Sequence, residues 1–226
     1  MHKIKHLFFD LDHTLWDFEK NSEETLTQLF SDYSIGNGTV DIDDFLKAYK
    51  KVNHELWDLY NVNKVTKEDI RLKRFPRTYV MVGLSALECP EGIGDEYLEI
   101  CPHKPHLIEG AIDLLEYLKD KYQLHILSNG FEKTQEIKLR TTGLDKYFDV
   151  VVTSESCGHK KPSKEIFDFA LEKAGANLEN AIMIGDNPIT DIKGAKEYGL
   201  KTIFFGNEKE VGDFNVQQLI EIKKYL

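Results

Sequence analysis

Near the N-terminus, two carboxylates follow an apolar run with a single residue between them. Asp10 and Asp12 come directly after residues 7–9 (LFF), and Thr14 adds a hydroxyl. Such an apolar run without turn residues is typical of a buried strand of a parallel sheet. Side chains two residues apart in an extended chain point the same way, and like charges that close raise each other's pKa unless a cation intervenes. The pair predicts a metal site, or a nucleophile beside a general acid or base. The alternative is a strand that simply ends in a polar turn.

Three further polar clusters follow later apolar runs of the chain. They lie at Ser128 and Asn129, at Lys161, and at Asp186 and Asp191. Because parallel strands end at one edge of a sheet, we expect these clusters to converge on the N-terminal pair. Carboxylates bind a hard cation such as Mg²⁺, while a lysine, a hydroxyl and backbone N–H groups suit a phosphate. A carboxylate held beside a bound phosphate can attack it and form an aspartyl-phosphate. The set predicts phosphoryl transfer.

From residue 106 onward, helical and strand patterns alternate. Strands are predicted at 7–9, 124–127, 148–153, 181–184 and 201–205. Apolar residues at three- and four-residue steps predict helices between them, and a closing helix is predicted at 216–225. This alternation requires a parallel sheet with helices on both faces. The predicted fold class is α/β, with a Rossmann-like, doubly wound parallel sheet.

The segment between the first strand and this alternating region has a different pattern, without a convincing strand. Helix starts are predicted at Asn21 or Ser22, at Asp41 or Asp43, and at Thr66 with Asp69 in a capping box. We therefore expect an all-α helical cap domain at 17–101. It is inserted into an α/β core (catalytic) domain made of residues 1–16 and 102–226.

Composition excludes several classes of partner. The 226 residues carry a net charge of -10, which argues against nucleic acid or an anionic membrane as the main partner. Three cysteines without close spacing favour reduced thiols over disulfides. Neither a signal peptide nor a membrane-spanning segment is evident, so a cytoplasmic location is expected. No pattern indicates an oligomeric state.

The four polar clusters, taken with their neighbours, resemble the four motifs of the haloacid dehalogenase-like hydrolases. In chain order they read 10–14 (DLDHT), 127–130 (LSNG), 161–162 (KP) and 185–191 (GDNPITD). Each follows a predicted strand, which is the structural context that such motifs need. The resemblance spans the whole chain and implies an α/β core with an inserted helical cap. It also implies an Mg²⁺-dependent enzyme for a small phosphorylated metabolite.

The resemblance assigns a role to each motif residue. Asp10 is expected to be the nucleophile and an Mg²⁺ ligand. Asp12 is expected to be the general acid and base, and its backbone carbonyl a further metal ligand. Ser128 and the N–H group of Asn129 would bind the phosphoryl group. Lys161 would neutralise charge on that group and on the nucleophile, an effect worth a few kcal/mol of transition-state stabilisation.

Two aspartates of the last motif complete the set that the resemblance implies. Asp186 is expected to be the remaining Mg²⁺ ligand, and Asp191 to orient Lys161 or a metal-bound water. Simpler interpretations of single residues stay open. Ser128 can end a strand, Asp191 can be an exposed helix charge, and Lys160 rather than Lys161 can face the site.

The second aspartate separates the reaction classes within this superfamily. Asp12 favours a phosphatase over a dehalogenase, because an alkoxide leaving group needs a proton and a halide does not. Phosphomutases also retain this residue, so a mutase stays an alternative. Members that act on phosphoglycolate or sugar phosphates commonly have glycine where His13 stands.

A closer resemblance is to the bacterial pyrimidine 5′-nucleotidases. The matching residues are 12–15 (DHTL) with Trp16 and Phe18, Asn53, Leu56, Trp57 and Tyr60, 128–131 (SNGF), 142–144 (TGL) and 147–149 (YFD). This implies a nucleoside 5′-monophosphate phosphatase with an aspartyl-phosphate intermediate. The alternatives are a phosphatase for a sugar phosphate or phosphoglycolate, and a catalytically inactive binding or regulatory protein. Two aromatic residues could stack a base or belong to the core, namely Trp16 and Phe18. Candidates to line the cap are Trp57, Tyr60, Arg74 and Arg77.

Overall fold

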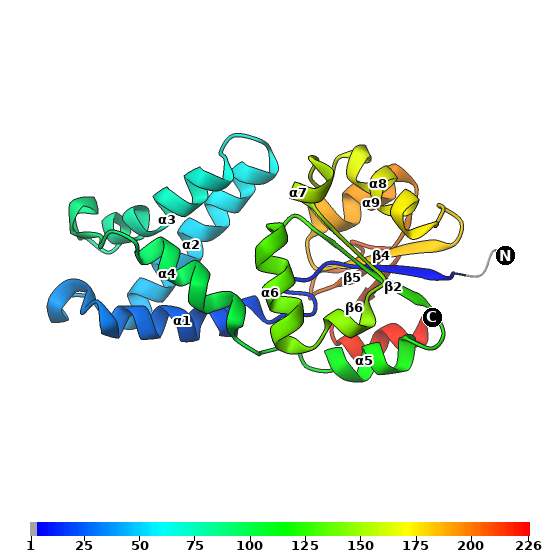
Figure 1. The fold of residues 1–226 in the computed structure, drawn as a ribbon, viewed down its shortest axis with the longest axis horizontal. Coiled ribbons are helices and arrows are strands. Elements are labelled where there is room, and N and C mark those ends of the chain that lie inside the picture. Colours follow the sequence, from blue (N-terminus) through cyan, green and yellow to red (C-terminus); the bar gives the residue numbers. More distant parts are fainter. Residues whose placement is uncertain (1–3) are drawn as a thin grey trace. The chain divides into compact units, whose positions relative to one another are not determined.

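The structure is a computed structural model that describes residues 4–226. It divides into two compact units. The α/β unit contains the chain up to Phe18 and the segment from Pro105 to Leu226, and the helical unit is Glu19–Lys104. Figure 1 shows the elements of both units in the colours of the sequence. Within residues 4–226, no helix has the length and apolar character needed to cross a membrane.

Six parallel strands form the sheet of the α/β unit. They are β1 (His6–Phe9), β2 (Gln123–Ser128), β3 (Val150–Thr153), β4 (Ala181–Gly185), β5 (Lys201–Phe205) and β6 (Phe214–Val216). Their spatial order is β3-β2-β1-β4-β5-β6. The chain builds the sheet outward in one direction from β1 through β2 and β3, and then in the other direction from β4. Ligands of α/β folds bind at the carboxyl ends of the strands beside such a reversal. The predicted α/β fold with a parallel sheet is confirmed.

Helices cover both faces of this sheet. They are α5 (Ala111–Leu118), α6 (Glu132–Thr142), α7 (Ser154–Cys157), α8 (Lys164–Ala174) and α9 (Gly194–Tyr198), with a π-helical turn at Pro188–Lys193 and a 3₁₀ turn at Asp145–Tyr147. In Figure 1, α8 and α9 lie on one side of the strands and α5 on the other. Phe8 and Met183 of the central strands pack with Ile166 and Phe167 of α8. Because both faces are covered, residues 7–9 and 181–184 of the two central strands are apolar at every position, which is why the sequence pattern revealed these strands.

The end of the chain differs from the prediction. Instead of a helix over 216–225, the chain forms β6, whose Val216 pairs with Phe205, and then a 3₁₀ turn at Leu219–Lys224. Leu219 and Ile222 are fully buried. Their spacing of three residues fits a 3₁₀ turn as well as an α-helix, so the apolar pattern alone could not separate the two.

The helical unit contains no strand between residues 19 and 104. Its elements are α1 (Phe18–Asp32), α2 (Ile42–Asn61), α3 (Lys67–Met81) and α4 (Ile93–Ile100), with 3₁₀ turns at Ile35–Gly38, Ala86–Glu88 and Cys101–His103. Two predicted helix starts are confirmed. The Asp41 side chain caps α2, and Thr66 with Asp69 forms a reciprocal capping box at α3.

The predicted start of the first helix is wrong. Helix α1 begins at Phe18, so Asn21 and Ser22 lie inside it and are buried at 0% and 5% exposure. The hydroxyl of Ser22 accepts a hydrogen bond from Tyr97 of α4 over 2.9 Å. Ser22 therefore contributes to helix packing and not to capping, a distinction that depends on a residue 75 positions away.

Candidate active site

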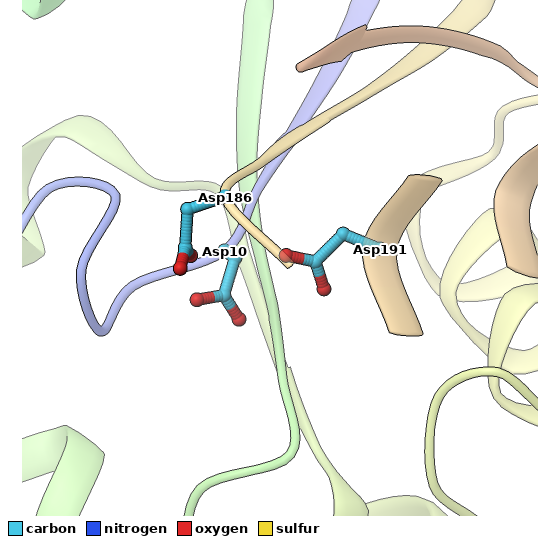
Figure 2. A group of neighbouring side chains, drawn as sticks. All are labelled: Asp10, Asp186 and Asp191. Atoms are coloured by element: carbon cyan, nitrogen blue, oxygen red, sulfur yellow. The ribbon is translucent and has the colours of Figure 1, made fainter. Parts of the chain in front are cut away.

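Three carboxylates gather at the carboxyl ends of the two central strands. Asp10 follows β1 and Asp186 follows β4, and these strands pair in register, Phe9 with Ile184. Asp191 comes from the π-helical turn after β4. Figure 2 shows the three side chains pointing toward one another, and one ligand oxygen from each lies within 4.8 Å of the others.

A buried lysine holds two of these carboxylates together. Lys161 Nζ lies 2.6 Å from Asp10 Oδ1 and 2.7 Å from Asp191 Oδ1, and it donates to the backbone oxygen of Leu127 over 2.6 Å. The lysine is only 1% exposed. Burial alone would lower the pKa of Lys161, but the charges and hydrogen bonds of the two aspartates outweigh burial and raise it. The structure thus places Lys161, and not Lys160, against Asp10 as a permanent cation.

Asp191 is committed to this lysine through one oxygen and to the backbone through the other. Its Oδ2 accepts a hydrogen bond from the N–H group of Asn187 over 3.0 Å. A Cβ atom at Gly185 would lie 2.2 Å from the same oxygen, so only glycine lets Asp191 reach this position. Among the predicted contacts of Asp191, the structure contains the one with Lys161. Both oxygens of Asp191 therefore already accept hydrogen bonds within the chain.

Asp10 and Asp186 are better placed to bind a metal ion. Asp10 contacts Lys161 through Oδ1, and Asp186 accepts the Thr14 hydroxyl through Oδ1 over 2.9 Å, so the Oδ2 atoms remain for a cation. Burial, followed by the charge of Asp191, raises the pKa of Asp186 to about 7. Burial also raises the pKa of Asp10, against the opposing charge of Lys161. A divalent cation would relieve this repulsion, and hard carboxylate oxygens fit Mg²⁺.

The motif after β2 supplies a hydroxyl and a clamp on the lysine. Ser128 ends β2, and its Oγ accepts hydrogen bonds from the N–H group of Gly130 over 3.0 Å and from Gln135 Nε2 over 2.8 Å. The Asn129 side chain accepts from the Lys161 N–H group over 2.7 Å and donates to the Lys161 carbonyl over 2.9 Å. The backbone of Lys161 is therefore fixed by Asn129, a function of that side chain that was not predicted.

Asp12 is held apart from the other carboxylates by helix α6. Lys138 Nζ forms an ion pair with Asp12 Oδ1, and Gln135 Nε2 donates to Oδ2 over 2.7 Å. The Lys138 ammonium also lies 4.3 Å from the centre of a Trp16 ring. Burial alone would raise the pKa of Asp12, but Lys138 and Gln135 outweigh it and lower the pKa. Asp10 and Asp12 thus have pKa values shifted in opposite directions, which is the arrangement that separates acid–base roles.

Lys138 and Gln135 were missed at the sequence level. Both lie on α6, three residues apart and so on one helix face, directly after the motif that contains Ser128. This spacing on one helix face was the sequence signal that could have identified them. A Cβ atom at Gly130 would lie 2.0 Å from Gln135 Nε2, so the glycine of this motif leaves the space that Gln135 occupies.

The aromatic candidates of the first motif lie within the α/β unit. Trp16 is 0% exposed and belongs to the core, which was the alternative to base stacking. Phe18 is partly buried and its ring lies 4.9 Å from that of His13. His13 has φ 63°, a left-handed conformation that glycine adopts at lower cost.

The candidates of the helical unit have different environments. Arg74 is buried, whereas Arg77 is exposed and donates to Glu55 over 2.9 Å. The Trp57 and Tyr60 rings lie 5.4 Å apart on the same helix.

Comparison with known proteins agrees with this geometry. Residues 4–199 match the model of a hydrolase family, described as haloacid dehalogenase-like hydrolase. The chain belongs to the haloacid dehalogenase-like hydrolases. Among family members, the chain is 36% identical over 197 residues to pyrimidine 5′-nucleotidase YjjG of Escherichia coli, covering 87% of this chain and 83% of the relative. It is 30% identical to pyrimidine 5′-nucleotidase PynA of Streptococcus pneumoniae, covering 98% and 92%.

A solved structure extends the agreement to the fold. The crystal structure of the HAD-hydrolase YfnB from Bacillus subtilis, bound to magnesium, has a TM-score of 0.89 and 29% identity with this chain. The similarity covers 99% of both chains. The predicted family and the predicted phosphatase class of this haloacid dehalogenase-like hydrolase are therefore confirmed.

Proposed function

We propose that this phosphatase is an Mg²⁺-dependent 5′-nucleotidase that hydrolyses pyrimidine nucleoside monophosphates through a phosphorylated Asp10. The α/β unit would be the catalytic core domain and the helical unit its cap domain. The different environments of Asp10 and Asp12 support the proposed mechanism. Asp10 contacts Lys161, whereas Asp12 contacts Lys138 and Gln135. The similarity to two pyrimidine 5′-nucleotidases supports the substrate class.

In the first half of the reaction, the Asp10 carboxylate attacks phosphorus while the bond from phosphorus to the leaving oxygen breaks. Lys161 holds Asp10 Oδ1 at 2.6 Å, which fixes the direction of the carboxylate. Asp12 gives a proton to the leaving oxygen, so the nucleoside leaves as an alcohol. The hydroxyl of Ser128, the N–H group of Asn129 and the charge of Lys161 would stabilise the transferring phosphoryl group.

In the second half, Asp12 takes a proton from water, which attacks phosphorus and frees Asp10 and inorganic phosphate. The lowered pKa of Asp12 favours the carboxylate that this step needs. In the first half Asp12 must carry a proton, so its ion pair with Lys138 has to loosen.

Asp10, Asp186 and the backbone carbonyl of Asp12 would bind Mg²⁺. The cation supplies positive charge that offsets the carboxylates and the phosphoryl oxygens in this buried site. Asp191 would stay outside this ligand set because both of its oxygens already accept hydrogen bonds, from Lys161 and from Asn187.

The test of the covalent mechanism is Asp10→Asn. We expect the variant to fold, because an amide oxygen can still accept from Lys161, and to show no turnover of any phosphomonoester with Mg²⁺ present. Asp113→Asn, an exposed aspartate of α5, is the matched control and should keep full activity. Trapping of labelled phosphate on the wild-type protein, and not on Asp10→Asn, completes the test. Full activity of Asp10→Asn would disprove a phosphorylated Asp10.

Substrate class and metal dependence need separate measurements. Comparison of kcat/KM for pyrimidine nucleotides, purine nucleotides, sugar phosphates and phosphoglycolate should rank the pyrimidine nucleotides first. A higher rank for sugar phosphates would overturn the nucleotidase assignment but not the mechanism.

A chelator should abolish turnover and added Mg²⁺ should restore it. A folded protein that hydrolyses no phosphomonoester with Mg²⁺ would favour the inactive binding or regulatory protein.

A further inference from the structure

The helical unit contains a buried arginine whose hydrogen-bonding capacity is only partly used. Arg74 of α3 is 3% exposed, and its Nη1 donates to Asn53 Oδ1 of α2 over 3.1 Å. Its Nε and Nη2 atoms are buried and have no hydrogen-bond partner within residues 4–226. Nor does any carboxylate of the described chain form an ion pair with it.

Aromatic rings, and not carboxylates, surround the Arg74 charge. The guanidinium carbon lies 4.5 Å from the ring centre of Tyr97, 5.4 Å from that of Tyr49 and 5.9 Å from that of Phe75. Ring faces attract a cation, but they do not accept the in-plane hydrogen bonds of Nε and Nη2. A buried cation with unpaired donors costs stability, and arginine cannot relieve the cost by losing its proton. The helical unit therefore contains an unfavourable group whose free donors are left for a partner.

The two unpaired atoms form the edge of the guanidinium that recognises planar groups. Arg71, one turn earlier on α3, shows the same edge in use, because its Nε donates to Asp95 Oδ1 and its Nη2 donates to Asp95 Oδ2 over 2.7 Å. Arg71 is thus a filled fork and Arg74 an open one. A fork of this kind binds two neighbouring acceptor atoms in one plane.

We propose that Arg74 is a binding site in the helical unit for a planar group with two neighbouring acceptor atoms. Asn53 holds the guanidinium from Nη1, and the Tyr97 ring lies against its face, so the open edge has a defined direction. The identity of the ligand rests on the proposed function. In a pyrimidine nucleotide, cytosine offers such a pair in N3 and O2, whereas uracil has a donor at N3. A carboxylate offers the same pair from another source.

Binding is tested first, with phosphate-free probes on the full chain. Titration calorimetry with cytidine, uridine and benzoate is carried out on wild type, Arg74→Lys, Arg74→Met and Arg71→Lys. Lysine keeps the charge but loses the fork. Arg71→Lys is the matched control, because it removes a fork that Asp95 already fills.

We expect wild type and Arg71→Lys to bind cytidine at least tenfold more tightly than uridine, and Arg74→Lys to lose at least tenfold in cytidine affinity. Preferred binding of benzoate, lost in the same variant, would also support the fork and would make a carboxylate its ligand. Equal binding by wild type and a folded Arg74→Lys would overturn the site. So would the absence of binding to every probe. If Arg74→Met does not fold, Arg74→Lys carries the test.

Turnover gives a second readout that a purely structural role would not produce. The loss of kcat/KM in Arg74→Lys should be at least tenfold larger for cytidine monophosphate than for p-nitrophenyl phosphate, and it should reside mainly in KM. Equal losses for both substrates would overturn a role in recognition. If wild type hydrolysed neither substrate, the proposed function would fail, while the calorimetric comparison would still decide the binding site.

Discussion

Lys161 in the α/β unit and Arg74 in the helical unit are both buried cations, at 1% and 3% exposure, with opposite surroundings. Lys161 contacts two carboxylates and a backbone carbonyl, so each of its three hydrogens has an acceptor. Arg74 has one amide oxygen and three aromatic rings, and two of its nitrogens are unpaired. The hydrogen-bonding capacity of Lys161 is used fully within the described chain, and that of Arg74 is not. A cation whose donors are all used within the chain suits a fixed catalytic position. A cation with unused donors suits recognition of a ligand.

A third buried basic group shows what burial does without a counter-charge. His125 of β2 lies against His6 of β1, with 3.1 Å between their ring nitrogens, and burial lowers the pKa of His125 to about 4. At neutral pH it is uncharged. Lys161 keeps its charge because the charges and hydrogen bonds of Asp10 and Asp191 outweigh burial and raise its pKa.

The largest expected effect comes from removing Lys161, whose donors all have acceptors. Lys161→Met removes the counter-charge of the buried Asp10 and Asp191 carboxylates, so kcat should fall about 10³-fold. The free energy of unfolding in urea should fall by about 3 to 5 kcal/mol. Lys160→Met removes the neighbouring lysine and should change neither quantity appreciably. Retention of wild-type stability in Lys161→Met would show that the carboxylates do not depend on this charge.

The next effect concerns the cation that holds Asp12. Lys138→Met should lower kcat about 10²-fold for nucleotides but less than tenfold for p-nitrophenyl phosphate, whose leaving group needs no proton. Lys133→Met, an exposed lysine on the same helix, is the control and should act like wild type on both substrates. Equal losses on the two substrates would mean that Lys138 supports the fold and does not position the acid–base group.

The histidine pair predicts a pH dependence of stability. Above pH 6.5 His125 is neutral in both the folded and the unfolded chain and contributes nothing. As the pH falls from 6.5 to about 4, the unfolded chain takes up a proton that folded His125 refuses, so stability is lost over this range and not further below it. The loss should be about 2 to 3 kcal/mol. Urea unfolding at pH 7 and 4.5 should show a smaller pH effect in His125→Gln. An unchanged pH effect would contradict the low pKa.

The smallest effect on stability is expected for Arg74, whose donors are only partly used. Arg74→Met removes a buried charge that has no counter-charge, so its free energy of unfolding without ligand should stay within about 1 kcal/mol of wild type. Urea unfolding beside Lys161→Met measures the contrast directly. A loss as large as that of Lys161→Met would mean that Arg74 holds the helices together, and the two buried cations would then have the same role.

Much of the fold was predictable because its signals are local. The strand at residues 7–9 is apolar at every position, since helices cover both faces of the sheet, and the capping box of Thr66 and Asp69 spans only three residues. Strand β6 was missed because three residues carry too little pattern, and the following apolar pair fitted two kinds of helix.

The order of residues along the chain is enough to reveal which residue types follow the parallel strands. Because such strands end at one edge, Asp10, Lys161 and Asp186 could be grouped from their order alone. How these side chains pair follows from the folded chain and not from their order. Lys138 reaches Asp12 across 126 positions, and Asn129 holds the backbone of Lys161 across 32. The unpaired donors of Arg74 also leave no trace in a local sequence pattern. A donor can be recognised as unpaired only when every neighbour in the folded chain is known.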